Sequence, residues 1–326
     1  MPPVAGPRRG GPVLLASSAG GHFTELQIIA RQRGIRRDEQ HWVVPSTAQT
    51  RSALAGHPSV TWVPQVGAHE FSKAVQQLGA ALRLHRALRP RMVLSAGAAQ
   101  AVPHLLAAGA LHTPVQYVES VARVDGPSLT GRLVAQLPTA QRYAPVPGWG
   151  RRWQTAPNVF SLFRAVPGDR REIRHAVVAL GTERFPFHRA LAEARAALPP
   201  AAEVIWQTGA TTYALRGSEL PHWIPSDELA EAMAGADVVI THAGAGSILT
   251  ALGVGHVPVV LPRSGALGEH VDEHQIRMAH GLAERGLVVL VRPGEALCPE
   301  HLERAAGTRV VVATSAALPV AEPVGH

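Results

Sequence analysis

Short, mostly apolar runs alternate with longer amphipathic segments along much of the chain. The runs are about three to five residues long, which is typical of strands buried on both faces of a parallel sheet. The segments between them have the length of helices, so the pattern predicts repeated βαβ units. In the first half, strands are expected at 13–17, 41–44, 60–63, 92–95, 115–118 and 142–144, and helices at 24–33, 47–55, 71–88, 99–111 and 128–137.

Prolines and glycines interrupt the pattern between residues 145 and 169, a segment that we interpret as an inter-domain connection. The sequence therefore predicts an α/β protein with two doubly wound, Rossmann-like domains, 1–165 and 166–312, facing each other across a cleft. Residues 313–326 are small and proline-spotted, and we expect them to be disordered. In the second domain, strands are expected at 176–180, 203–207, 238–240, 257–261 and 288–291, and helices at 188–198, 227–233, 248–252, from about 272, and at 299–306.

The charge of the chain is distributed unevenly between its two halves. The net charge of the 326 residues is +7, but residues 1–165 carry 18 Lys and Arg against 6 Asp and Glu, whereas residues 166–326 carry 13 against 18. A basic half fits an anionic partner, such as a membrane surface or a diphosphate. We expect no nucleic-acid partner, because no nucleic-acid-binding motif occurs and aromatic residues make up only 5% of the chain.

Cysteine content and hydropathy indicate the cellular compartment of the protein. The single cysteine, Cys298, excludes an internal disulfide and fits a reducing cytoplasm. No signal peptide is evident, and no apolar run reaches the roughly 18 residues that a membrane span needs. We therefore expect a cytoplasmic protein.

The clearest candidate for a ligand site lies between residues 236 and 279. Strand 238–240 is followed by the small-residue loop THAGAG and by a helix, with Ser247 expected at its N-cap. Glycines allow close approach of the backbone, and the N–H groups and dipole of a helix N-terminus favour an anion. This pattern predicts a phosphate site; the alternative is an ordinary βαβ unit whose glycines serve tight turns. The candidate residues are His242, Gly244, Ala245, Gly246 and Ser247.

Further polar residues follow strand ends in the same half of the chain. Gly181-Thr182 comes directly after one predicted strand and Gln207-Thr208 ends the next, and either pair alone would be an ordinary turn. Because the carboxyl ends of parallel strands meet at one edge of a sheet, together they support a shared nucleotide pocket. The start of the helix expected near residue 272 adds candidates for binding the ligand's sugar, namely Glu269, His270, Asp272 and Gln275.

The same helix start contains a possible metal motif. His270, Glu273 and His274 match the H-x-x-E-H pattern of inverted zinc peptidases, and two histidines four residues apart on a helix can share a metal. So short a motif arises easily by chance. No D-x-D pair occurs anywhere in the chain, although metal-dependent glycosyltransferases usually hold their metal with carboxylates so spaced. We therefore expect neither a metal nor a cofactor, and keep a zinc hydrolase as an alternative.

Two strand ends in the first half carry candidate catalytic side chains. Gly20-Gly21-His22 follows the first strand, where a histidine can act as a general base at neutral pH; the alternative is local packing. Glu119 follows strand 115–118 and is either a base, a ligand contact or an ion-pair partner of Arg123. Arg123 itself is, like Gly20, Gly21 and Gly97, a candidate for binding the acceptor. Gly97, after strand 92–95, is expected to bring the backbone close to the same ligand.

Longer segments carry a resemblance to a known family. The first half resembles the acceptor-side subunit of the two-subunit N-acetylglucosaminyltransferase that builds dolichol-linked oligosaccharide, and its bacterial exopolysaccharide relatives. The second half resembles the donor-side subunit, and both halves are more distantly similar to the transferase that makes lipid II. The similar segments are SSAGGHFTEL (17–26), SAGAAQAVP (95–103) and YVESVARVDGPSLTGRL (117–133), then LGTERFPFHR (180–189), IWQTGA (205–210), HAGAGSILTAL (242–252) and GEHVDEHQ (268–275).

The resemblance implies a GT-B glycosyltransferase that is inverting and metal-independent. It would move a hexose from a UDP-sugar to a polyprenyl-diphosphate-linked sugar in cell-surface or exopolysaccharide assembly. By motif, the glycine loop and Ser247 would meet the diphosphate, the polar helix start would meet the ribose or hexose, and Gly20-Gly21-His22 would face the acceptor. The chain departs from the family at Thr250, where the donor-side subunit usually has glutamate, and in having no N-terminal anchor, so the expected attachment is peripheral, on the inner face of the plasma membrane.

Two other functions fit parts of this pattern. One is a UDP-sugar-dependent transferase that acts on a soluble natural product and has no need of a membrane. The other is a catalytically idle module that recruits a partner to the membrane, for which loss of donor binding would be the sign.

Overall fold

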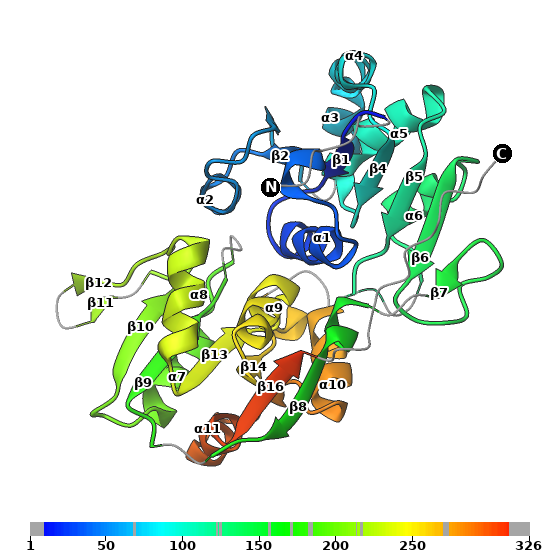
Figure 1. Cartoon of the computed structure of the whole chain (residues 1–326). Coiled ribbons are helices and arrows are strands. Elements are labelled where there is room, and N and C mark those ends of the chain that lie inside the picture. The colour runs from blue at the N-terminus through cyan, green and yellow to red at the C-terminus, as the bar shows by residue number, and fades with distance from the viewer. Residues whose placement is uncertain are drawn as a thin grey trace, which may run out of the picture. The chain divides into compact units, whose positions relative to one another are not determined.

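The chain forms two compact units, which divide between residues 157 and 158; the sequence placed the boundary between 165 and 166. In Figure 1 the first unit runs from blue to green and the second from green to red. The residues that this computed structural model describes are 10–67, 70–121, 123, 126–155, 158–169, 172–181, 185–212, 214–215, 218–269 and 274–312. The expected disordered tail lies outside them.

The first unit is built on a seven-stranded parallel sheet in the order β3-β2-β1-β4-β5-β6-β7. The six strands that the sequence predicts are present, and a short seventh adds to the edge. The apolar residues of β1 are fully buried, as expected for a strand near the middle of a covered sheet. The strands are β1 (Val13–Ala16), β2 (Gln40–Pro45), β3 (Val60–Val63), β4 (Met92–Ser95), β5 (Val115–Val118), β6 (Ala140–Ala144) and β7 (Gln154–Thr155).

Helices connect these strands and pack on the sheet (Figure 1). The core between them contains Leu14, Val43, Val93, Leu105 and Val115. The helices are α1 (Gly21–Gln32), α2 (Ala48–Ala53), α3 (Phe71–Gln76), α4 (Leu78–Leu88), α5 (Val102–Ala110) and α6 (Leu129–Val134), with 3-10 turns η1 (Arg37–Glu39) and η2 (Ala99–Ala101).

Several helix boundaries differ from the expected ones, and the hydrogen bonds explain two of the differences. Helix α1 begins at Gly21 rather than at 24, because the carbonyl of Gly20 accepts the N–H groups of Phe23 and Thr24 and so starts the helical hydrogen bonding early. The helix expected over 71–88 is two helices, α3 and α4, which meet at Gln77. There the Gln77 N–H donates to the carbonyl of Ala74, three residues back, which tightens the turn.

The second unit is built on a five-stranded parallel sheet in the order β10-β9-β13-β14-β15. Two short antiparallel pairs, β8 with β16 and β11 with β12, accompany it. Its strands are β8 (Phe163–Pro167), β9 (His175–Ala179), β10 (Glu203–Gln207), β11 (Ala214–Leu215), β12 (Ser218–Glu219), β13 (Val238–His242), β14 (Val259–Leu261), β15 (Val289–Leu290) and β16 (Thr308–Val312). Its helices are η3 (Val159–Leu162), α7 (His188–Ala197), α8 (Ser226–Gly235), α9 (Ala245–Gly253), η4 (Gly265–Leu267), α10 (His274–Glu284) and α11 (Pro299–Ala306).

Strand β8 lies in the segment that the sequence analysis took as an inter-domain connection, and that interpretation is wrong for 163–167. The five residues of β8 pair with all five of β16, at the other end of the unit's sequence. Its partners are distant in sequence, so no local pattern reveals them. The core of this unit includes Val177, Met233, Val239 and Ala251.

Candidate functional site

Each large sheet has one point at which the strand order reverses. In the first unit the chain builds outward from β1 to β3 and then returns to place β4 on the other side of β1. In the second unit it returns after β10 to place β13 on the other side of β9. Open α/β sheets bind ligands at the carboxyl ends of the strands beside such a reversal. The residues to inspect are therefore those that follow β1 and β4, and those that follow β9 and β13.

His22 lies at the reversal point of the first unit. It is in the first turn of α1, and its Nδ1 lies 3.0 Å from the carbonyl oxygen of Ala96, just after β4. A carbonyl can only accept, so Nδ1 carries the proton and Nε2 keeps a lone pair. Burial lowers the pKa of His22 below its usual value, while the Ala96 hydrogen bond and the charge of Glu119 raise it by less. The imidazole is therefore neutral at pH 7, the form that can accept a proton.

The backbone conformation of Gly97 and its closeness to Tyr117 favour glycine at this position beside His22. A Cβ at this position would lie 3.1 Å from the hydroxyl of Tyr117 and 3.6 Å from Cε1 of His22, and the backbone has a φ of +107°. The next residue, Ala98, has a φ of 69° and a ψ of 159°, a strained conformation for a residue with a side chain. Strain of this kind is common at ligand sites, and here it shapes the loop that positions His22.

Glu119 is also near this point, but its carboxylate is occupied. The side chain is 1% exposed. One oxygen accepts the Tyr117 hydroxyl at 3.2 Å, and the other accepts the N–H and the hydroxyl of Ser128 at 2.9 and 3.0 Å. Ser128 is the N-cap of α6, so Glu119 holds the start of that helix. Of the other predicted acceptor residues, Gly20 (φ +81°) forms the N-cap of α1 and Gly21 is its first residue, while the Arg123 N–H donates to the carbonyl of Ser120.

The reversal point of the second unit is formed by the start of α9. The N-cap is Gly244 and not Ser247, so that prediction was wrong by three residues. The Ile248 N–H already bonds to the carbonyl of Gly244, which places Ala245, Gly246 and Ser247 in the first helical turn. Their N–H groups have no partner within the helix, and Gly244 supplies no side-chain cap. Residues 244–247 are partly exposed, so this helix start can accept an anion.

The ring of His242 explains why two of the predicted site positions are glycine. The ring is largely buried, and its Nδ1 lies 3.4 Å from the carbonyl oxygen of Ala179. A Cβ on Gly181 would lie 2.5 Å from the ring, and a Cβ on Gly244 would lie 2.1 Å from it. Both positions therefore need glycine to accommodate His242, and Gly181 also has a φ of +80°. From the sequence, Gly244 was expected to allow close approach of a phosphate, and Gly181 to belong to a shared nucleotide pocket.

Glu269 is held by an arginine that the sequence analysis missed. Arg189, in α7, donates to both carboxylate oxygens at 3.0 Å, and the Ser264 N–H donates to one of them at 3.1 Å. Glu269 thereby anchors the loop after β14 to α7, in place of the expected contact with a sugar. The segment LGTERFPFHR contains Arg189, but nothing local to it indicates a partner 80 residues away.

The other residues predicted to bind the sugar donor differ in their burial and hydrogen bonding. Gln207 and Thr208 are buried and bonded to the segment at 221–224, through Ile224 N–H to Gln207 Oε1 and Thr208 N–H to Pro221 O. Thr250 is partly exposed and bonds back to the carbonyl of Gly246. The Oε1 of Gln275, at the start of α10, is buried without a hydrogen-bond partner among the described residues. Thr182, His270, Asp272 and Glu273 lie outside the described residues, as does the side chain of His274.

Metal sites and membrane spans can be assessed only for the described part of the chain. Within it, no group of three or more His, Cys, Asp or Glu side chains is placed to hold a metal ion. No helix in the described ranges is long and apolar enough to cross a membrane.

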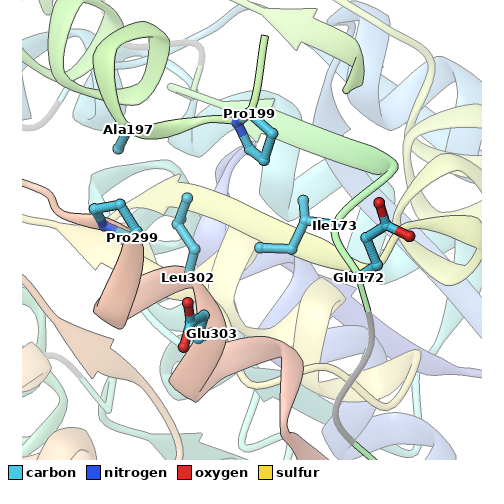
Figure 2. Close-up of a pocket in the computed structure, with 7 residues that line it drawn as sticks. All are labelled: Glu172, Ile173, Ala197, Pro199, Pro299, Leu302 and Glu303. Carbon is cyan, nitrogen blue, oxygen red and sulfur yellow. The ribbon is translucent and has the colours of Figure 1, made fainter. Parts of the chain in front are cut away.

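A hollow of about 360 Å³ lies elsewhere in the second unit (Figure 2). Glu172 and Ile173 line it just before β9, Pro199 lines it before β10, and α11 forms the facing wall (Figure 2). It is thus at the amino ends of these strands, opposite the end where α9 begins. A ligand of the reversal point would not occupy it.

Comparison with solved structures identifies the architecture. The structure of MurG from Acinetobacter baumannii is similar over 91% of this chain and 93% of that chain, with 16% identity and a TM-score of 0.55. The structure of the glycosyltransferase SnogD from Streptomyces nogalater is similar over 91% of this chain and 90% of that chain, with 17% identity and a TM-score of 0.56. The fold is GT-B. A UDP-GlcNAc 2-epimerase from Methanocaldococcus jannaschii, in complex with UDP-GlcNAc and UDP, is also similar, over 90% and 91% of the two chains, with 12% identity and a TM-score of 0.55. The GT-B fold alone therefore does not separate transferases from epimerases.

Sequence comparison is more specific for the second unit. Residues 175–303 match the model of the glycosyltransferase family 28 C-terminal domain. This match spans β9 through α11 and includes the start of α9. No curated protein matches the chain significantly. The second unit is thus similar in sequence to the C-terminal domain of a glycosyltransferase family, and the chain has the GT-B fold.

Proposed function

We propose that this protein is an inverting, metal-independent glycosyltransferase that moves a hexose from a UDP-sugar to a sugar linked to polyprenyl diphosphate. The observation that carries the proposal is the uncapped start of α9, at the reversal point of the sheet in the unit that matches the glycosyltransferase family 28 C-terminal domain. An anion-binding site at this helix start would bind the diphosphate of a nucleotide sugar. The resemblance of the first half to an acceptor-side subunit supports the choice of acceptor.

The proposed reaction is a single displacement. The Nε2 of His22 takes the proton of the acceptor hydroxyl, since Nδ1 is held by Ala96 and the ring is neutral. The hydroxyl oxygen bonds to the anomeric carbon as the bond from that carbon to the diphosphate breaks. UDP leaves with its charge facing the N–H groups of Ala245, Gly246 and Ser247. Glu119 is a poorer candidate for the base, because both of its oxygens already accept hydrogen bonds.

Donor binding tests this proposal directly. A panel of nucleotide sugars is measured by thermal stabilisation, where a ligand at about 100 times its dissociation constant adds roughly 2.7 kcal/mol. We expect a UDP-sugar to stabilise the wild type and not the Gly246→Val variant, whose branched side chain would stand where the phosphate binds. Gly253→Val is the matched control, because Gly253 lies at the other end of the same helix with open space around it. Equal stabilisation of both variants would remove the α9 start from the donor site.

The acceptor is tested separately. The basic first half should bind anionic vesicles, more weakly as salt screens the contact. Activity on a polyprenyl-diphosphate sugar should persist in excess EDTA. Full activity on a water-soluble acceptor, without vesicle binding at any salt concentration, would favour a natural-product transferase instead. Loss of activity in EDTA with recovery on adding zinc would contradict the metal-independent mechanism.

A further inference from the structure

Glu25 is a buried carboxyl group that the proposed mechanism does not use. It lies in α1, three residues after His22, and has no exposed surface. Residues three apart lie on the same side of a helix, so both side chains belong to the region around the first unit's reversal point. The Oε1 of Glu25 accepts the backbone N–H of Val121 at 3.2 Å, and Val121 is in the loop that follows β5.

The surroundings of this carboxyl favour its neutral form. Its Oε2 is buried and has no hydrogen-bond partner among the described residues. An ionised carboxylate in this place would be a buried charge with one oxygen unpaired. Burial raises the pKa of Glu25 to about 8, and the nearby charge of Glu119 raises it too, against the opposing hydrogen bonds from Val121 and Ser120.

The loop that Glu25 contacts also carries the other polar groups of this region. Glu119 begins it and binds both Tyr117 and the start of α6. The carbonyl of Ser120 accepts the N–H of Arg123, a residue expected to meet the acceptor. The titratable groups that interact with Glu25 are thus Glu119, at the end of β5, and Tyr117, within it. The hydrogen bond from Val121 to Glu25 joins this loop to the helix that carries His22.

We propose that Glu25 is a positioning residue whose buried, protonated carboxyl ties α1 to the loop after β5. Ionisation would place a charge in the interior with Oε2 unpaired, and the loop opens so that water can solvate this charge, which weakens acceptor binding. The assignment of the loop to the acceptor rests on the proposed function. Glu25 cannot touch a substrate, because none of its surface is exposed. Its effect passes through the Val121 backbone, which fixes where Glu119 and Arg123 lie relative to His22.

The experiment compares Glu25→Gln with Glu25→Leu. Glutamine has nearly the same shape, still accepts the Val121 N–H and cannot ionise. Leucine fills a similar buried volume but has no atom that can accept the hydrogen bond from the Val121 N–H. Glu231→Gln, in an exposed part of α8, controls for the substitution itself. Exchange of the backbone amides in peptides that cover residues 119–123 is followed by mass spectrometry from pH 6 to 9.5, as protection relative to the intrinsic exchange rate.

In the wild type, protection of this loop should be lost as the pH rises through about 8. Glu25→Gln should keep it throughout the range, and Glu25→Leu should lack it at every pH. In parallel, the acceptor KM should rise by about tenfold for Glu25→Leu at pH 7, the expected cost of one lost hydrogen bond, while the donor KM stays unchanged. The same rise should appear in the wild type above pH 8 and not in Glu25→Gln.

Two outcomes would overturn the assignment of Glu25. One is an alkaline loss of protection that persists in Glu25→Gln, and the other is a rise in the acceptor KM in Glu25→Gln equal to that in Glu25→Leu. The exchange measurement needs no substrate, so it separates this inference from the proposed function. If the loop shows the predicted protection but the protein has no transferase activity, the contact between α1 and the loop is supported. The role of the loop in acceptor binding is then wrong.

Discussion

Three buried titratable side chains of the first unit are neutral, whereas two arginines of the second unit, one fully and one largely buried, keep their charge and are hydrogen-bonded. In the first, Glu25, His85 and His104 are each at most 2% exposed, and burial moves the pKa of each toward the neutral form. In the second, Arg263 is fully buried and donates to the carbonyls of Leu180 and Phe185, and Arg189 forms its pair with Glu269. A guanidinium keeps its charge at any working pH, so burying it requires partners.

This difference matches what each half of the proposed reaction needs. Proton transfer from an acceptor hydroxyl needs a neutral side chain with a free lone pair, and His22 supplies one, because burial lowers its pKa. Holding a leaving diphosphate needs fixed donors, and the start of α9 supplies backbone N–H groups whose state does not change with pH. The comparison therefore predicts that pH and side-chain changes act on the two units differently.

The largest expected effect is on the chemical step of the first unit. His22→Ala should lower kcat by about 10²–10⁴-fold, the usual loss on removing a general base, with donor binding nearly unchanged. Glu119→Gln should lose much less, because an amide oxygen can still accept from Ser128. Steady-state kinetics and calorimetry with UDP would check this. A larger loss for Glu119→Gln than for His22→Ala would exchange their roles.

Breaking the buried pair should be the largest effect on the second unit. Arg189→Met leaves Glu269 buried without its cation and should reduce the free energy of unfolding by about 3 kcal/mol. The double variant Arg189→Met/Glu269→Gln removes both charges, keeps an acceptor for the Ser264 N–H, and should lose less than half as much. Urea denaturation at pH 7 measures both.

The exposed pair of Arg174 and Glu172 is the control for this comparison. Their side chains are 72% and 74% exposed, so Arg174→Met should lower the free energy of unfolding far less than Arg189→Met does. An equal cost for Arg174→Met and Arg189→Met would mean that burial does not distinguish the two pairs.

The stacked pair His85 and His104 should make the first unit sensitive to acid. Their rings lie 5.6 Å apart, and burial lowers the pKa of His85 to about 4 and that of His104 to about 3. The folded state therefore binds fewer protons than the unfolded state below pH 6.5, and stability falls as the pH drops toward these values. At pH 5 each histidine should cost about 2 kcal/mol relative to pH 7.

Substitution of one histidine isolates this effect. In His104→Leu the loss of stability between pH 7 and pH 5 should shrink by about 2 kcal/mol, whatever the change at pH 7. His188→Leu, at an exposed position of the second unit, is the control. An unchanged pH dependence in His104→Leu would show that His104 does not titrate with unfolding.

The smallest effect concerns the strained loop beside His22. Ala98→Gly should raise the free energy of unfolding by about 1 kcal/mol, because glycine adopts a positive φ without strain. Ala101→Gly, in the ordinary helical backbone of η2, should instead lower it by about 0.5–1 kcal/mol. Thermal denaturation of the two variants gives the comparison, and a change of the same sign in both would argue against strain at Ala98.

The sequence by itself determined the alternation of strands and helices and the places where ligand chemistry is concentrated. Apolar runs such as 13–17 and 238–240 became buried parallel strands, because their hydrophobicity can be buried only between two helical layers. His22 and the glycine loop before α9 were identified because the residues of each lie together in the chain. The pairing of β8 with β16 was not identified from the sequence, because the two strands are far apart in the chain.

Only the tertiary structure decided which of the polar residues are free for a ligand. Glu119 and Gln207 lie at strand ends and Glu269 lies in a loop after a strand, yet each accepts hydrogen bonds from another segment of its own unit. Gly181 and Gly244 are glycines because the ring of His242 fills the space beside them. A sequence pattern records which groups reach the carboxyl edge of a sheet. Whether those groups are already paired depends on long-range contacts, which exist only once the sheet and its helices are assembled.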